Sequence, residues 1–312
     1  MSLSANCKLG FSLSCIKKFS CMYSELERNK NMMVFHNCSA YIKEWMTKQP
    51  CVKEESLTDW MLFDISNKLP QIYYQAFTRH EESSNGCDWE WWILTPDQFN
   101  IRRTNAYRFL VQAKKLLPVT KDNYPLFNYS NRNGLQIELL LKSAQYKKAF
   151  PLYMFYSNEH PDNETQIELL DFIDEAILRW CATCDNGGYL ASASMIYEMI
   201  LGNKRMKYSA IDILNYSCKL SLCDKLFSQC GTETDEILSH FNKQLIKRYG
   251  TKGKYNDTRM KNRGIKYDID TIPRYVHSFM ENKDKDISWF ESEMHRQLGD
   301  IGGLGIIDLR NE

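Results

Sequence analysis

Four polar residues occupy alternating positions in two otherwise apolar segments of the chain. Asp88 and Glu90 lie two residues apart in a tryptophan-rich run, and Gln112 and Lys114 lie two residues apart in a later run. Because side chains alternate between the faces of a strand, each pair is expected to share one face. If the two strands pair, all four side chains converge on one patch. Buried polar groups need partners, and a divalent cation is one such partner.

These residue types suit the hydrolysis of a phosphodiester bond. Oxygen atoms of Asp88, Glu90 and the Gln112 amide would hold Mg²⁺ or Mn²⁺. Such an ion lowers the pKa of a bound water and neutralises developing charge, and the Lys114 ammonium would stabilise the phosphate. Simpler interpretations exist. Asp88 could end a turn, and Glu90 with Lys114 could form an ordinary cross-strand ion pair.

The elements that position these residues follow one another as helix, three strands, helix and strand. The helical stripe of Leu57, Trp60, Met61 and Ile65 predicts a first helix that starts near Ser56. The following elements are predicted at 72–78, 87–94, 107–113, 135–149 and 151–156. The last connection passes through a helix, as a parallel strand requires. The sequence therefore predicts an α/β fold with an αβββαβ core.

The chain as a whole has a globular composition. It has 312 residues, of which 43% are hydrophobic and 25% charged, and its net charge is +1. We expect an N-terminal extension and helix over 1–50, the core over 51–160 and a mostly helical domain over 161–312. A late strand is predicted at 304–309. The chain has no apolar run long enough to span a membrane, which predicts a cytoplasmic protein.

The cysteines predict reduced thiols rather than disulfides. There are eleven, and they follow no repeating spacing. Cys181 and Cys184 form a CxxC pair that could bind zinc together with Cys223 and Cys230. Because no second CxxC accompanies the pair, buried structural thiols are favoured.

The order of elements, with Asp88 entering the second strand and Gln-x-Lys on the third, resembles the PD-(D/E)XK (restriction-endonuclease-like) nuclease superfamily. Gln112 departs from the usual acid, and Q-x-K is similar to the version in Mrr-type restriction enzymes. The resemblance implies a Mg²⁺-dependent deoxyribonuclease, with DNA expected ahead of RNA as its substrate. It also implies that Glu55 adds a helix glutamate to the site and that Gln136 lies near the substrate.

More narrowly, several motifs are similar to those of an uncharacterised bacterial family with suspected roles in phage defence. They are Glu55-Ser-Leu-Thr-Asp59, Phe77-Thr78 with Glu82, Gly86-Cys-Asp-Trp-Glu-Trp-Trp92, Val111-Gln-Ala-Lys114 and Pro151-Leu-Tyr-Met-Phe-Tyr156. The resemblance implies an antiviral effector with a regulatory protein partner or a homo-oligomeric state. A catalytically inactive nucleic-acid-binding or scaffold protein is the alternative, because position 112 lacks an acid.

A local basic segment supports a nucleic-acid partner. Residues 243–266 contain nine Lys or Arg residues and one acid. Such a run could follow a phosphate backbone, or could simply be a solvated loop. The candidate nucleic-acid-binding residues are Lys247, Arg248, Lys252, Lys254, Arg259, Lys261 and Arg263.

Overall fold

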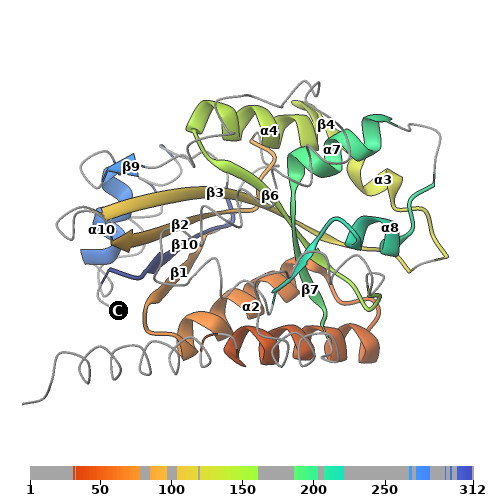
Figure 1. Cartoon of the computed structure of the whole chain (residues 1–312), viewed down its shortest axis with the longest axis horizontal. Helices are drawn as coiled ribbons and strands as arrows, with labels where there is room; N and C mark the ends of the chain where they lie inside the picture. Colours follow the sequence, from red (N-terminus) through yellow and green to blue (C-terminus); the bar gives the residue numbers. More distant parts are fainter. Residues whose placement is uncertain are drawn as a thin grey trace, which may run out of the picture.

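The computed structural model places a mixed β-sheet between two layers of helices (Figure 1). The described residues are 31, 33–77, 85–96, 104–118, 120–160, 186–202, 207–220, 267–268, 272–281, 292, 296 and 301–310. The α/β class predicted from the sequence is therefore confirmed for this part of the chain.

Among the described residues, eight strands form the central sheet, in the order β1-β10-β2-β3-β6-β7-β8, with β9 also paired to β3. Their bounds are Ile72–Ala76 (β1), Trp89–Pro96 (β2), Thr104–Lys115 (β3), Phe150–Tyr156 (β6), Gly188–Ser192 (β7), Cys218–Lys219 (β8), Tyr267–Asp268 (β9) and Gly303–Asp308 (β10). The β10–β2 and β3–β6 pairs are parallel, and the other pairs are antiparallel. A separate two-stranded sheet joins β4 (Ser130–Asn131) to β5 (Gly134–Leu135).

One face of the sheet packs against a helix over 33–48 and against α2 (Glu54–Lys68). Ile42, Met61 and Trp89 belong to the core between them. The opposite face carries α4 (Gln136–Lys147), α7 (Ala193–Gly202) and α10 (Arg274–Glu281), with the short helices α3 (Tyr124–Phe127) and α8 (Ala210–Leu214) beside them. Helices on both faces explain why every residue of β6 is buried and why its sequence is apolar throughout.

The predicted elements from β1 to β6 are present in the predicted order, and β2 pairs with β3 as expected. The first helix starts at Glu54 rather than near Ser56, with Lys53 as its N-cap residue. The tryptophans at 89, 91 and 92 are core residues.

The pairing of β1 differs from a simple three-strand meander. β10 lies between β1 and β2, antiparallel to the first and parallel to the second. The late strand predicted at 304–309 is thus confirmed, and it lies inside the core sheet. Strands β7, β8, β9 and β10 all come from the half predicted to be a mostly helical domain. The predicted core at 51–160 therefore omits strands that belong to its own sheet.

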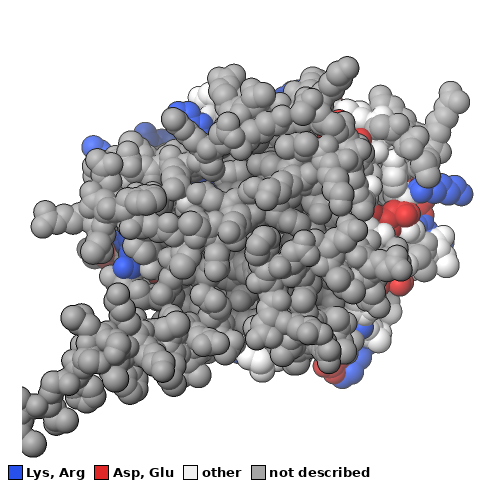
Figure 2. All heavy atoms as spheres, in the orientation of Figure 1, with Lys and Arg blue, Asp and Glu red and all other residues white. Residues whose placement is uncertain are grey.

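Several predictions fall outside the described residues. They concern the basic segment 243–266, the cysteines at 181, 184, 223 and 230, and most of the extension before residue 31. On the face drawn in Figure 2, described side chains of both charge signs lie at the margins of the molecule. Of the described cysteines, Cys38, Cys51 and Cys87 are free thiols. Within the described ranges, no helix has the length and apolar character needed to cross a membrane.

Candidate active site

The candidate site lies where β3 extends beyond the start of β2. Trp89, the first residue of β2, pairs with Val111, and the residues after Val111 pair with β6. Asp88 lies just before β2, and its backbone N–H donates to the Val111 carbonyl at 2.8 Å. Its Oδ2 accepts hydrogen bonds from Gln112 Nε2 at 2.5 Å and from the backbone N–H of Ala113 at 2.7 Å. The end of β3 therefore holds the Asp88 carboxylate in place.

Gln112 contributes a buried oxygen beside this carboxylate. The side chain is only 1% exposed, and its Nε2 also donates to the Ala113 carbonyl at 3.0 Å. Its Oε1 is buried and accepts no hydrogen bond in the part of the chain that the structure describes. Leaving a buried acceptor without a hydrogen bond costs about 1–3 kcal/mol of stability. Binding of a ligand that contacts this oxygen would therefore be favoured.

Glu54, rather than Glu55, is the α2 carboxylate that reaches the end of β3. Glu54 Oε2 accepts a hydrogen bond from the backbone N–H of Lys115 at 2.7 Å. Burial raises the pKa of Glu54 to about 7; the positive charge of Lys114 opposes this rise, and the negative charge of Asp88 adds to it. Glu54, Asp88 and Lys114 are thus close enough to influence one another electrostatically.

A pocket of about 170 Å³ opens beside these groups. Its walls combine four carboxylates with aromatic and small residues, and they include neither lysine nor arginine. The lining residues are Glu54, Glu55, Thr58, Asp59, Tyr74, Phe77, Asp88, Trp89, Ala113 and Gly302. An anionic substrate would be repelled by these walls unless a cation neutralised part of their charge.

The donor set for such a cation is small. Among the described residues, no group of three or more His, Cys, Asp or Glu side chains is arranged to hold a metal ion. Glu54 and Asp88 supply two carboxylates, and the unpartnered Gln112 Oε1 supplies a neutral oxygen. Oxygen donors of these kinds are the ones that Mg²⁺ accepts. Glu54 and Asp88 line the pocket, whereas Gln112 reaches the site through its hydrogen bond to Asp88.

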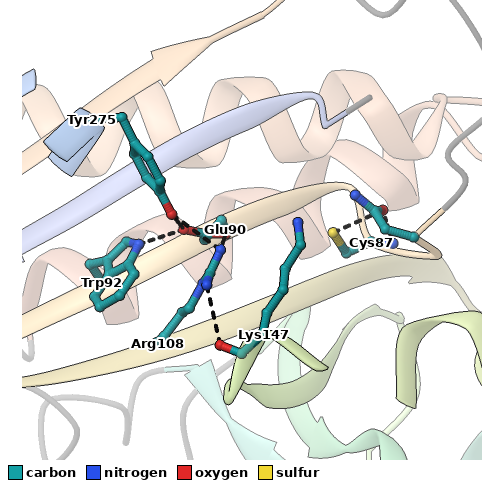
Figure 3. Close-up of polar contacts among 7 residues, drawn as sticks. Cys87, Glu90, Trp92, Arg108, Lys147 and Tyr275 are labelled. Carbon is teal, nitrogen blue, oxygen red and sulfur yellow. Dashed lines mark hydrogen bonds and ion pairs between the residues drawn. The ribbon is translucent and has the colours of Figure 1, made fainter. Parts of the chain in front are cut away.

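Glu90 does not belong to this site, which corrects its predicted roles as a catalytic residue and metal ligand. Its carboxylate is fully buried on the opposite face of β2, among the side chains drawn in Figure 3. Oε2 pairs with Arg108 Nη2 at 2.8 Å, and Oε1 accepts from Trp92 Nε1 and from the Tyr275 hydroxyl, each at 2.5 Å. Asp88, just before β2, lines the pocket instead.

The same cluster also contains a lysine. Lys147 lies beside Arg108 and Cys87 in Figure 3, and its carbonyl accepts a hydrogen bond from Arg108 Nη1 at 3.2 Å. Burial lowers the pKa of Lys147, and the negative charge of Glu90 opposes that change. The alternative interpretation, an ion pair between Glu90 and Lys114, is therefore wrong: Glu90 belongs to a buried network with Arg108.

Glu55 and Gln136 both lie near the site, Glu55 on α2 and Gln136 at the start of α4. Glu55 is exposed at the start of α2 and lines the pocket. Gln136 opens α4, whose first turn packs closely against the loop before β2. Gly86 makes this approach possible: its φ is +74°, and a Cβ there would lie 2.5 Å from the Gln136 carbonyl oxygen. Gly86 therefore allows α4 to approach the loop that carries Asp88.

The raised pKa of Glu54 predicts a pH-dependent stability of the metal-free protein. A carboxyl group whose folded pKa exceeds its unfolded value stabilises the fold fully below the unfolded pKa, and this contribution is lost as the pH rises through the folded pKa. We expect the free energy of unfolding of the wild type to fall, relative to Glu54→Gln, between about pH 4.5 and about pH 7. The limiting slope is about 1.4 kcal/mol per pH unit.

Urea unfolding with chelator present, measured at several pH values, tests this expectation. Glu55→Gln is the matched control, because it removes the neighbouring, exposed carboxylate from the same helical turn. It should keep the wild-type slope. Parallel stability curves for the wild type and Glu54→Gln would contradict the burial of an ionisable Glu54.

The described residues thus form a mixed α/β protein with a carboxylate-lined pocket at one end of the β2–β3 pair. Residues 31–295 match the model of DUF6615, a family of unknown function, and the chain belongs to that family. No curated protein and no solved structure matches the chain.

Proposed function

We propose that this protein is a metal-dependent nuclease that hydrolyses phosphodiester bonds, with DNA as its substrate. The observation that carries the proposal is the assembly at the end of β3. Asp88 is hydrogen-bonded to Gln112, and Glu54 is hydrogen-bonded to the backbone of Lys115. Lys114 acts electrostatically on Glu54. This arrangement supports the resemblance to PD-(D/E)XK nucleases. It combines a helix glutamate, an aspartate at the start of one strand and Gln-x-Lys on the next strand.

The residues that would hold Mg²⁺ or Mn²⁺ are Glu54, Asp88 and Gln112. A bound ion would supply an activated water and charge neutralisation at the phosphate. The backbone N–H groups of Ala113 and Lys115 orient the two carboxylates, one each. Because these donors belong to β3 rather than to a loop, the carboxylates are held before substrate arrives.

Lys114 has a role that needs no contact with the metal ion. It lies on β3 between the two residues whose N–H groups orient the carboxylates, and its charge lowers the pKa of Glu54. Lys114 does not line the pocket wall, so its ammonium group would favour the ionised form of Glu54 and would have to extend towards the bound substrate to stabilise negative charge on a phosphate. Removing one such preorganised donor typically costs about 10²–10³ in rate.

Cleavage assays with Lys114→Ala test the proposal. Supercoiled plasmid, linear duplex, single-stranded DNA and RNA are each incubated with the wild type in Mg²⁺, in Mn²⁺ and in chelator. We expect metal-dependent cleavage of DNA by the wild type and a loss of about 10²–10³ in the variant. Lys142→Ala is the control, because it removes an exposed lysine of α4. It should cleave like the wild type.

Two other results would change the assignment. Metal-dependent cleavage of RNA alone would retain the nuclease and correct its substrate. If the wild type cleaves none of the four polymers with either metal, yet binds one of them as tightly as Lys114→Ala does, the catalytic proposal fails. The nucleic-acid-binding alternative would then account for the chain.

A further inference from the structure

β10 reaches the candidate site from a distant part of the sequence. Its first residue, Gly303, pairs with Trp89 of β2 on one side and with Ala76 of β1 on the other. Trp89 directly follows Asp88, and Gly302, which directly precedes β10, lines the pocket. The N-terminal end of β10 therefore lies next to Asp88.

Gly302 holds the backbone of Asp88 from the side opposite β3. Its N–H donates to the Asp88 carbonyl at 2.5 Å, and its own carbonyl accepts from the Phe77 N–H at 2.8 Å. The Asp88 N–H is bonded to Val111 of β3. Both backbone groups of Asp88 are thus engaged, one by β3 and one by the residue that leads into β10.

Gly303 allows β1 to lie close to this point. A Cβ at Gly303 would be 2.8 Å from Tyr74 Cε2 and 3.0 Å from the Tyr74 hydroxyl oxygen. Tyr74 lines the pocket, and its hydroxyl donates to Asp59 Oδ1 at 3.4 Å. A side chain at position 303 would therefore push a wall of the pocket.

We infer that Gly302 and Gly303 are positioning residues of the site: β10 fixes the Asp88 backbone and the Tyr74 wall, and so sets the geometry in which the site binds its cation. The inference rests on the metal-dependent activity proposed above. Both glycines lie beyond residue 295, where the match to the DUF6615 model ends. The site accordingly depends on a strand that the family match does not cover.

Two alanine substitutions in the same strand separate positioning from stability. Gly303→Ala places a methyl group against Tyr74 at the pocket, whereas Gly305→Ala places one against Trp91, 2.4 Å from its Cδ1. Trp91 is a core residue and does not line the pocket. Both changes should lower the thermal stability, because each methyl group meets an aromatic ring.

The decisive measurement is the dissociation constant for Mn²⁺ alone, determined by titration calorimetry at a temperature where circular dichroism shows each variant folded. We expect Gly303→Ala to raise this constant about tenfold, because small displacements of a preorganised site have large effects. Gly305→Ala should stay within about twofold of the wild type. In a Tyr74→Ala background, the additional Gly303→Ala change should alter the Mn²⁺ dissociation constant little, because the tyrosine ring that the new methyl group would displace is absent.

Each contrary result has a distinct meaning. If the wild type binds Mn²⁺ but Gly303→Ala and Gly305→Ala weaken binding equally, or neither weakens it, β10 is only a structural strand and the inference is overturned. If Gly303→Ala weakens binding as strongly without the Tyr74 ring as with it, the Tyr74 wall is not the cause. Absence of Mn²⁺ binding by the wild type would overturn the proposed function and this inference together.

Discussion

Replacing Asp88 by asparagine is expected to reduce metal-dependent cleavage by about a thousandfold while leaving the fold intact. The carboxylate accepts hydrogen bonds from Gln112 and from the Ala113 N–H through a single oxygen, Oδ2. Asparagine keeps one oxygen for these donors but loses the negative charge that a cation requires. A metal ion contributes several kcal/mol to such a reaction, and each 1.36 kcal/mol is a factor of ten in rate.

Glu90→Gln is the matched control for this prediction. It neutralises a carboxylate only two residues away, but one that lies on the other face of β2 and is engaged by Arg108, Trp92 and Tyr275. We expect Asp88→Asn to lose Mn²⁺ binding in calorimetric titrations, and Glu90→Gln to keep it despite a lower stability. Equal loss of Mn²⁺ affinity in the two variants would contradict the separation of these carboxylates.

The sequence predicts the elements of this site better than it predicts which side chain each element contributes. Apolar runs and helical stripes reflect burial, so β1, β2, β3, α4 and β6 are all anticipated along the chain. Alternation along β2 does not predict that Asp88 lines the pocket while Glu90 is buried in a separate network. Gln112 and Asp88 nevertheless meet as predicted, since β2 and β3 pair in the required register.

The choice between Glu54 and Glu55 could have been made from the sequence. Glu54 lies three and four residues before Leu57 and Thr58, both of which are buried against the sheet. Residues at these spacings share one face of a helix, so the apolar stripe of α2 points to Glu54 as the carboxylate that faces the sheet. The resemblance to a family motif favoured Glu55, which is exposed.

Long-range partners could not be anticipated in the same way. Tyr275 reaches Glu90 from a helix 185 positions later in the chain, and β10 enters between two strands that precede it by more than 200 residues. Nothing in the local pattern of a strand specifies which distant strand pairs with it. A buried Glu90 needs a partner, and the sequence predicts a metal ion in that role. Arg108 of β3 is the partner instead, through its ion pair with Glu90.

The buried pair between Glu90 and Arg108 carries the largest expected effect on stability. Their side chains are 0% and 8% exposed, and removing one partner of a buried ion pair leaves an uncompensated charge. We expect Arg108→Met to lower the free energy of unfolding by about 3–5 kcal/mol. Urea unfolding monitored by circular dichroism measures this loss.

The control is an ion pair with a similar N–O distance but more exposure to solvent. Arg310 Nη2 lies 2.7 Å from Asp308 Oδ2, and the two side chains are 28% and 11% exposed. Solvent weakens such a pair, so Arg310→Met should cost no more than about 1 kcal/mol. A similar cost for the two arginine variants would show that burial does not decide the strength of these pairs.

A double substitution separates the unpaired charge from lost packing. In a Glu90→Gln background the glutamine oxygen can still accept from Trp92 and Tyr275, and no buried negative charge remains to be compensated. Arg108→Met should therefore cost at least about 2 kcal/mol less in this background than in the wild type, a coupling within the range found for contacting residues. If the arginine change costs the same in both backgrounds, its effect comes from packing against the Trp92 ring, over which the guanidinium lies at 5.3 Å.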